Sequence, residues 1–154
     1  MSLAKTFYLL KDAETRTGEL YALIALNVSI TQPGLAELFR DLAAEEEQHA
    51  RQVEMIRGFF KESPDCFLET PEAEAVIASF VENLETIRRF VNQQYASLKP
   101  ADLVRLALDV ERQLVERHHT FIFHISDPQL KRLFESLNLG NEAHIGRLES
   151  FSLS

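Results

Sequence analysis

The chain has 154 residues, of which 45% are hydrophobic and 26% are charged, and an excess of acidic side chains gives it a formal net charge of −8. This composition is typical of a soluble globular protein with one domain, residues 1–154, and the acidic excess argues against partners such as nucleic acid or an anionic membrane. Because no apolar run approaches the roughly 20 residues of a membrane-spanning helix and no leader pattern opens the chain, we expect a cytoplasmic protein.

Apolar residues recur at steps of three and four along the chain, which is the pattern of amphipathic helices, and strand-like alternation is absent. Two long helices are predicted first, at about residues 5–30 and 34–61. A further helical stretch follows at about 71–98, as one helix or two. Two more long helices are predicted at about 101–125 and 128–151. The fold class is therefore all-α, with four long helices and a helical crossover between the second and the third.

Turn and cap residues mark the boundaries between these helices. The first helix ends at the turn sequence Thr31-Gln32-Pro33-Gly34, and the second stops before Ser63-Pro64-Asp65. Lys99-Pro100 separates the crossover from the next helix. Both Thr70-Pro71-Glu72 and Ser126-Asp127-Pro128 place a capping residue before a proline at the first helical position.

Each long helix carries one stripe of residues at steps of three and four, which should face the core. The stripes are apolar except near their middle. The interrupting residues are Glu14 and Thr17 in the first helix, Glu46 and His49 in the second, Glu111 and His118 in the third, and Asn141 and His144 in the fourth. The neighbours Glu45 and Glu47 fall off the stripe, so we expect them to face solvent.

The buried glutamates need partners, because an unpaired carboxylate in a protein core costs several kcal/mol. The stripes contain no lysine or arginine, which leaves the histidines or a bound cation. Carboxylate and imidazole donors suit iron or manganese, with zinc as a further option. We therefore predict a metal site built from Glu14, Glu46, His49, Glu111 and His144. The alternative is a buried network in which glutamates bond to histidine and tyrosine without an ion.

The first half of this pattern resembles the ferritin-like di-iron carboxylate bundles, most closely the rubrerythrin-like branch. In that family two helices each give one glutamate and the other two each give a Glu-x-x-His pair. Glu14 begins ETRTGELY, which matches the family's Glu-x6-Tyr with its tyrosine at Tyr21. Glu46 and His49 match the first Glu-x-x-His.

The second half repeats the pattern with two departures. Glu111 takes the position of the family's third glutamate, with His118 where tyrosine is usual, and His144 matches the second histidine. The second Glu-x-x-His has Asn141 in place of its glutamate, and Glu142 follows it. One residue turns a helical side chain by about 100 degrees, so Glu142 is a weaker candidate ligand, as is Asn141. With three carboxylates the second metal should bind weakly or not at all.

The resemblance implies an antiparallel four-helix bundle whose two iron ions, or one, react with dioxygen or peroxide and take electrons from an external donor. It also implies a homodimer, and Tyr21 and His118 as groups that orient ligands on facing helices, unless they only pack the core. Rubrerythrins have a further glutamate where this chain has Leu114, and a rubredoxin-type domain, which a chain with the single cysteine Cys66 cannot form.

Whether the protein is an enzyme of the oxidoreductase class is therefore left open. The alternatives are an iron-binding or sensing module without turnover, or a structural bundle that has lost its metal. His119 and His124 lie off the stripes and are expected on the surface. An apolar stripe in the crossover should cover the bundle or form a dimer interface; its residues are Ile77, Phe80, Leu84, Ile87 and Val91.

Overall fold

The computed structural model describes residues 3–62, 71–123 and 125–151, and their regular structure is helical, which confirms the all-α class. Its elements are α1 (Leu3–Val28), α2 (Pro33–Glu62), α3 (Pro71–Gln94), the short 3-10 helix η2 (Tyr95–Ser97), α4 (Pro100–Phe123) and α5 (Pro128–Ser150). The predicted stretch at 71–98 is thus a single α-helix that ends in a 3-10 turn. No helix among the described residues is long and apolar enough to cross a membrane.

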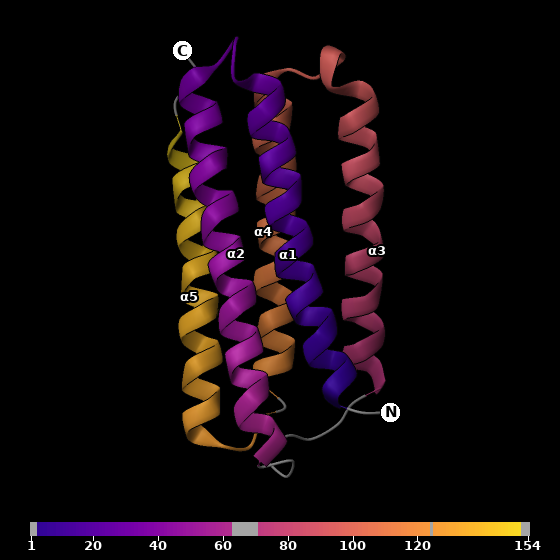
Figure 1. The fold of residues 1–154 in the computed structure, drawn as a ribbon, viewed down its shortest axis with the longest axis vertical. Coiled ribbons are helices and arrows are strands. Elements are labelled where there is room, and N and C mark those ends of the chain that lie inside the picture. Colours follow the sequence, from indigo (N-terminus) through magenta and orange to yellow (C-terminus); the bar gives the residue numbers. More distant parts are fainter. Residues whose placement is uncertain (1–2, 63–70, 124, 152–154) are drawn as a thin grey trace.

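The helices lie side by side and alternate in direction along the chain (Figure 1). The pairs α1 and α2, and α4 and α5, are antiparallel neighbours. The helix α1 also contacts α4, and α2 contacts α5, so these four helices surround a common interior. The helix α3 runs the length of the molecule outside this group, packed against α1 and α4, and returns the chain to the end where α4 begins.

The helix ends follow the cap chemistry of the sequence where the structure describes it. Asp127 accepts a hydrogen bond from the Leu130 amide at 2.9 Å, with Pro128 at the start of α5, as predicted. Asp102 accepts from the Lys99 amide at 3.1 Å at the start of α4. The predicted cap at Thr70, the stop at Ser63-Pro64-Asp65, Cys66 and His124 lie outside the described residues.

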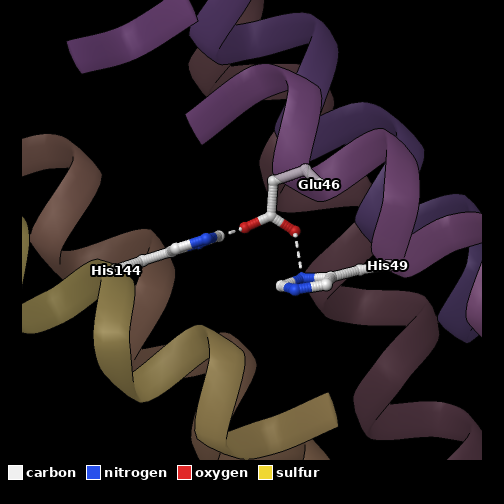
Figure 2. Close-up of side chains that lie close together, drawn as sticks. All are labelled: Glu46, His49 and His144. Carbon is white, nitrogen blue, oxygen red and sulfur yellow. Dashed lines mark hydrogen bonds and ion pairs between the residues drawn. The ribbon is translucent and has the colours of Figure 1, made fainter. Parts of the chain in front are cut away.

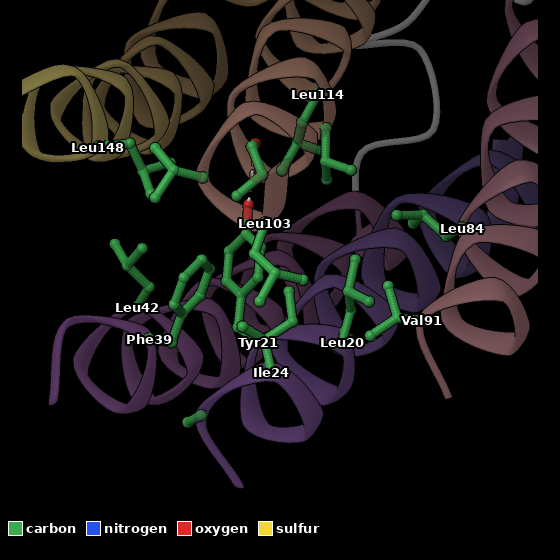
Figure 3. Packing of buried hydrophobic residues seen from close by; sticks show 14 of the residues in the cluster. Leu20, Tyr21, Ile24, Phe39, Leu42, Leu84, Val91, Leu103, Leu114 and Leu148 are labelled. Carbon is green, nitrogen blue, oxygen red and sulfur yellow. Dashed lines mark hydrogen bonds between the residues drawn. The ribbon is translucent and has the colours of Figure 1, made fainter. Parts of the chain in front are cut away.

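The core consists of two apolar clusters separated by a polar layer. One cluster contains Leu20, Ile24, Phe39 and Leu103 and fills the end of the bundle near the α1–α2 turn (Figure 3). The other fills the opposite end and includes Phe7, Phe121 and Phe134, whose ring centroids lie 5.0 to 5.8 Å apart. The polar interruptions of the four stripes lie between the clusters, and burial confirms that they face inward.

The apolar stripe of α3 covers the bundle within the same chain. Ile77, Phe80, Leu84 and Val91 are all less than 4% exposed and belong to the two clusters. The alternative use of this stripe as a dimer interface is wrong, because its side chains are already buried against α1 and α4.

Candidate metal centre

The carboxylate of Glu46 lies at the centre of the polar layer, between two imidazoles (Figure 2). Its Oε1 is 2.8 Å from His144 Nδ1, and its Oε2 is 3.3 Å from His49 Nδ1. The two rings lie nearly parallel, with centroids 5.2 Å apart. One ligand atom from each of the three residues lies within 4.8 Å of the others, so this buried group could hold a metal ion.

Two further glutamates extend this group on opposite sides. Glu111 Oε1 is 3.1 Å from His144 Nδ1, and Glu14 Oε2 is 3.8 Å from His49 Nδ1. All three carboxylates are fully buried. One oxygen of Glu46 therefore faces His49 and Glu14, and the other faces His144 and Glu111. The structure brings together all five ligands predicted from the sequence, from the four helices α1, α2, α4 and α5.

Both the distances between the donor atoms and the lack of hydrogen-bond partners for some carboxylate oxygens fit a bound cation. Ligands held about 2.1 Å from an ion lie about 3.0 to 3.4 Å from one another, and the four contacts above span 2.8 to 3.8 Å. Both oxygens of Glu14 and Oε2 of Glu111 have no hydrogen-bond partner among the described residues. Buried carboxylate oxygens are rarely left without a partner, so an ion would supply what the protein does not.

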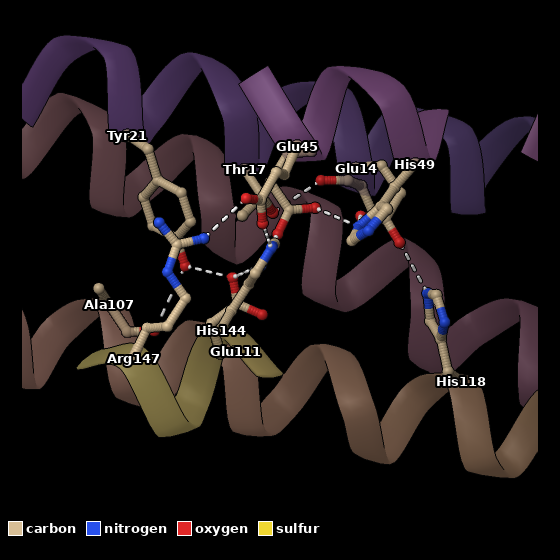
Figure 4. A network of polar contacts seen from close by, with 12 residues as sticks. Glu14, Thr17, Tyr21, Glu45, His49, Ala107, Glu111, His118, His144 and Arg147 are labelled. Carbon is tan, nitrogen blue, oxygen red and sulfur yellow. Dashed lines mark hydrogen bonds and ion pairs between the residues drawn. The ribbon is translucent and has the colours of Figure 1, made fainter. Parts of the chain in front are cut away.

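Tyr21 and His118 each meet a glutamate from a facing helix (Figure 4). The Tyr21 hydroxyl, on α1, donates to Glu111 Oε1 on α4 at 2.9 Å. His118, on α4, places Nε2 3.0 Å from Glu14 Oε1 on α1, although the pair is not aligned as a hydrogen bond. The two contacts are reciprocal between α1 and α4, and each restrains the carboxylate that it meets.

Burial and mutual repulsion decide where protons reside in the metal-free cluster. Burial, together with the charges of Glu111 and Glu14, raises the pKa of Glu46 well above its ordinary value. Burial opposes ionisation of Glu14, but its contacts with Glu46 and His118 hold its pKa well below the ordinary value. Burial lowers the pKa of His144, but Glu111 and Glu45 outweigh burial and raise it. Because a raised pKa favours the protonated form, a cation would compete with protons for Glu46 and His144.

The side chain of Glu45 is 42% exposed, in line with its place off the core stripe, but it also contacts the site. Its Oε2 lies 2.6 Å from His144 Nε2, and Arg147 donates to its Oε1 at 2.7 Å. Hydrogen bonding at Nε2 leaves His144 Nδ1 for Glu46, Glu111 and an ion, which is the usual way a carboxylate orients a ligating histidine. The contact depends on the relative position of α2 and α5, which no pattern within one helix reveals.

The two weaker candidate ligands differ in position. Asn141 is fully buried, and neither its Oδ1 nor its Nδ2 is hydrogen-bonded to any described residue. Glu142 points away from the cluster toward His119, 3.8 Å away, and both side chains are about half exposed. The helix turn between adjacent residues keeps Glu142 out of the site, and His119 lies on the surface as expected.

The ring of His49 lies directly against the backbone of α5 at Gly140. A Cβ atom at this position would be 2.8 Å from His49 Nε2, closer than real contacts allow, and 3.1 Å from Cε1, which is tighter than most real contacts. We expect Gly140→Ala to push His49 off its position, to lower the free energy of unfolding by about 1–3 kcal/mol and to weaken metal binding. Urea unfolding and metal titration would measure both effects.

Gly146 provides a matched control on the same helix. A Cβ atom there meets no atom within 4 Å, so Gly146→Ala should be neutral or should stabilise the helix by up to about 1 kcal/mol. Equal effects of the two substitutions would contradict the close packing of His49 on Gly140.

The fold and the site together define an all-helical protein with a buried glutamate and histidine cluster that could hold a metal ion. Comparisons with known proteins add no relative: no family model, no curated protein and no solved structure matches the chain.

Proposed function

We propose that this protein is a ferritin-like metalloprotein of the rubrerythrin type, which binds ferrous iron through Glu14, Glu46, His49, Glu111 and His144. One observation carries the proposal: the two oxygens of the buried Glu46 face two separate pairs, each made of one imidazole and one further carboxylate. Glu46 would therefore hold iron together with residues of both pairs. Manganese or zinc could use the same donors.

The path of the chain supports the ferritin-like assignment. The antiparallel pair α1 and α2 is followed by the long helix α3, which carries the chain back along the bundle before the second antiparallel pair, α4 and α5. Each of the four inner helices supplies at least one side chain to the centre, as in the ferritin-like di-iron proteins.

Iron bound in such a site supplies electrons for the reduction of dioxygen or peroxide. The protein's own side chains hold the ion, exclude bulk water by burial between two apolar clusters, and orient the ligands through Tyr21, His118 and Glu45. In this proposal the electrons come from a donor outside the bundle.

A second function, iron binding or sensing without turnover, is favoured by Asn141. This neutral amide stands at the buried position where the family pattern has a fourth carboxylate. Two divalent ions would be only partly neutralised by three glutamates, so the second ion should bind weakly.

Anaerobic loading with Fe(II) tests the proposal. After desalting, we expect at least one iron ion per chain. When air is admitted, we expect this iron to be oxidised, and absorption spectroscopy would monitor the oxidation. Iron that is retained but not oxidised would favour the binding or sensing function. A protein that retains no iron would contradict both and would leave the buried polar network as the alternative.

We also expect a rise in pH to lower the stability of the metal-free protein and to increase the stabilisation that bound metal provides. Folding raises the pKa values of Glu46 and His144, so protonation of these groups favours the folded state. This contribution to stability is present at low pH and is lost as the pH rises through their pKa values in the folded protein. Glu14 has a lowered pKa and acts in the opposite sense only below its ordinary value of 4.5. The metal-free protein should therefore be less stable at about pH 8.5 than at about pH 6.5, whereas bound metal should stabilise it more at the higher pH.

Thermal unfolding with a chelator or with saturating Zn(II), at both pH values, would measure this. Glu142→Gln, which removes an exposed carboxylate beyond the cluster, should leave the pattern unchanged. The same pH dependence with and without metal would contradict displacement of protons by the ion.

A further inference from the structure

A buried pair of side chains, Glu14 on α1 and His118 on α4, lies next to the cluster around Glu46 (Figure 4). His118 Nε2 is 3.0 Å from Glu14 Oε1, and both side chains are 0% exposed. The two groups are not aligned as a hydrogen bond, and all four of their polar atoms have no hydrogen-bond partner among the described residues. A buried imidazole and a buried carboxylate therefore meet without satisfying each other.

A cation between these two side chains would satisfy both. Buried carboxylates and imidazoles are rarely left without partners, because the loss of water is then uncompensated. Donor atoms bound about 2.1 Å from one ion lie about 3.0 to 3.4 Å apart, and the separation of 3.0 Å fits this range. Iron, manganese and zinc all accept a carboxylate oxygen and a neutral imidazole nitrogen. The pair therefore has the chemistry of two ligands to a divalent ion.

This pair is distinct from the cluster around Glu46. His49 and His144 each approach a Glu46 oxygen, at 3.3 and 2.8 Å. His118 instead approaches Glu14, whose Oε2 is 3.8 Å from His49 and whose Oε1 is near His118, so the two oxygens meet different imidazoles. His118 is also not among the ligands that the ferritin-like resemblance predicts, since tyrosine is usual at its position. An ion at His118 would therefore occupy a site particular to this chain.

The helix α5 offers further oxygen ligands at the level of His118. The rings of Phe121 on α4 and Phe134 on α5 have centroids 5.0 Å apart, and the two helices are antiparallel neighbours. His118 is three residues before Phe121, so it lies level with residues three or four positions after Phe134, which include Asn138. Asn141 follows about one turn further along the same buried face. Oδ1 of both amides is buried and has no hydrogen-bond partner among the described residues, so either could complete the coordination of an ion.

We propose that Glu14 and His118 form a second site for a divalent transition-metal ion, separate from the ion held at Glu46. The inference rests on the proposed function for the class of ion, but its own observation is the unsatisfied pair of Glu14 and His118. It gives a second ion a position that needs no carboxylate at Asn141. With one carboxylate at the site, this ion should bind more weakly than the ion at Glu46.

Equilibrium dialysis of the full chain against Zn(II), which is redox-inert, counts the ions bound at each concentration. We expect the wild-type protein to bind two ions per chain. His118→Leu removes the imidazole and keeps a side chain of similar size. It should raise the dissociation constant of the weaker ion at least about tenfold and should keep the tighter ion. His118→Phe serves the same purpose if circular dichroism shows that the first variant does not fold.

His119→Leu is the matched control, since His119 is the next residue of α4 and its side chain is 61% exposed. This variant should bind two ions, as the wild-type protein does. A histidine that only positions Glu14 would give a different result: His118→Leu would weaken the tighter ion and leave the number of ions unchanged. That result would overturn the proposal.

His49→Leu separates this proposal from the metal centre at Glu46. The variant should lose the tighter ion and keep one ion, which the further substitution His118→Leu removes. A wild-type protein with one ion, lost in His49→Leu and unaffected in His118→Leu, would overturn the second site and leave the proposed centre intact. One ion with the reverse behaviour would support the second site and contradict the centre. A protein that binds no ion would overturn both.

Discussion

Replacing Glu46 with glutamine should weaken the binding of a divalent metal ion at least about 100-fold. Loss of a residue that only orients a ligand typically costs 10- to 100-fold in metal affinity, and Glu46 contacts both histidines directly. Glutamine keeps the shape of the side chain but loses its charge and one oxygen. Isothermal titration with Zn(II) or anaerobic Fe(II) would measure the change.

The same substitution should not destabilise the metal-free protein. Burial raises the pKa of Glu46, and repulsion by the buried carboxylates of Glu111 and Glu14 raises it further. A neutral amide relieves that repulsion, so the free energy of unfolding should stay the same or increase. Glu142→Gln, on the neighbouring surface of α5, is the control and should change neither quantity. A destabilised Glu46→Gln protein with unaltered metal affinity would instead identify a structural polar network.

Introducing a fourth carboxylate by Asn141→Glu should destabilise the metal-free protein and strengthen metal binding, which is the opposite of what we expect for Glu46→Gln. Asn141 is fully buried and without a hydrogen-bond partner among the described residues, so a glutamate there adds an uncompensated charge to an acidic cluster. The metal-free variant should lose about 3 kcal/mol or more of stability, because an unpaired buried charge has a cost of that order. Added metal should restore the stability, and a second ion should bind more tightly.

Asn141→Gln is the matched control for this variant, since glutamine has the shape of glutamate without its charge. It should be less destabilised, and metal should stabilise it no more than it stabilises the wild-type protein. Equal losses of stability in both variants, with no rescue by metal, would show that the residue at 141 has no contact with an ion site.

Much of this architecture follows from local sequence patterns. The ends of the four long helices lie within two residues of the predicted ranges, because turn residues and proline positions constrain them locally. The inward orientation of Glu14, Glu46 and Glu111 also follows, since helical periodicity assigns each to the face that bears the large apolar side chains.

The contacts that depend on how helices pack against one another did not follow. Glu45 reaches His144 only because α2 and α5 lie at a particular separation and register, and His49 fits only because α5 has Gly140 at the contact. Neither contact can be predicted from a periodic sequence pattern within one helix. The position of α3 against α1, rather than in a dimer interface, likewise depends on packing beyond a single stripe.

The most direct test of the metal centre is anomalous X-ray diffraction at the iron edge from crystals loaded anaerobically with Fe(II). We expect an anomalous peak inside the bundle, within bonding distance of Glu46 and of His49 or His144. No peak at this position, with the three side chains still hydrogen-bonded to one another, would contradict the metal centre.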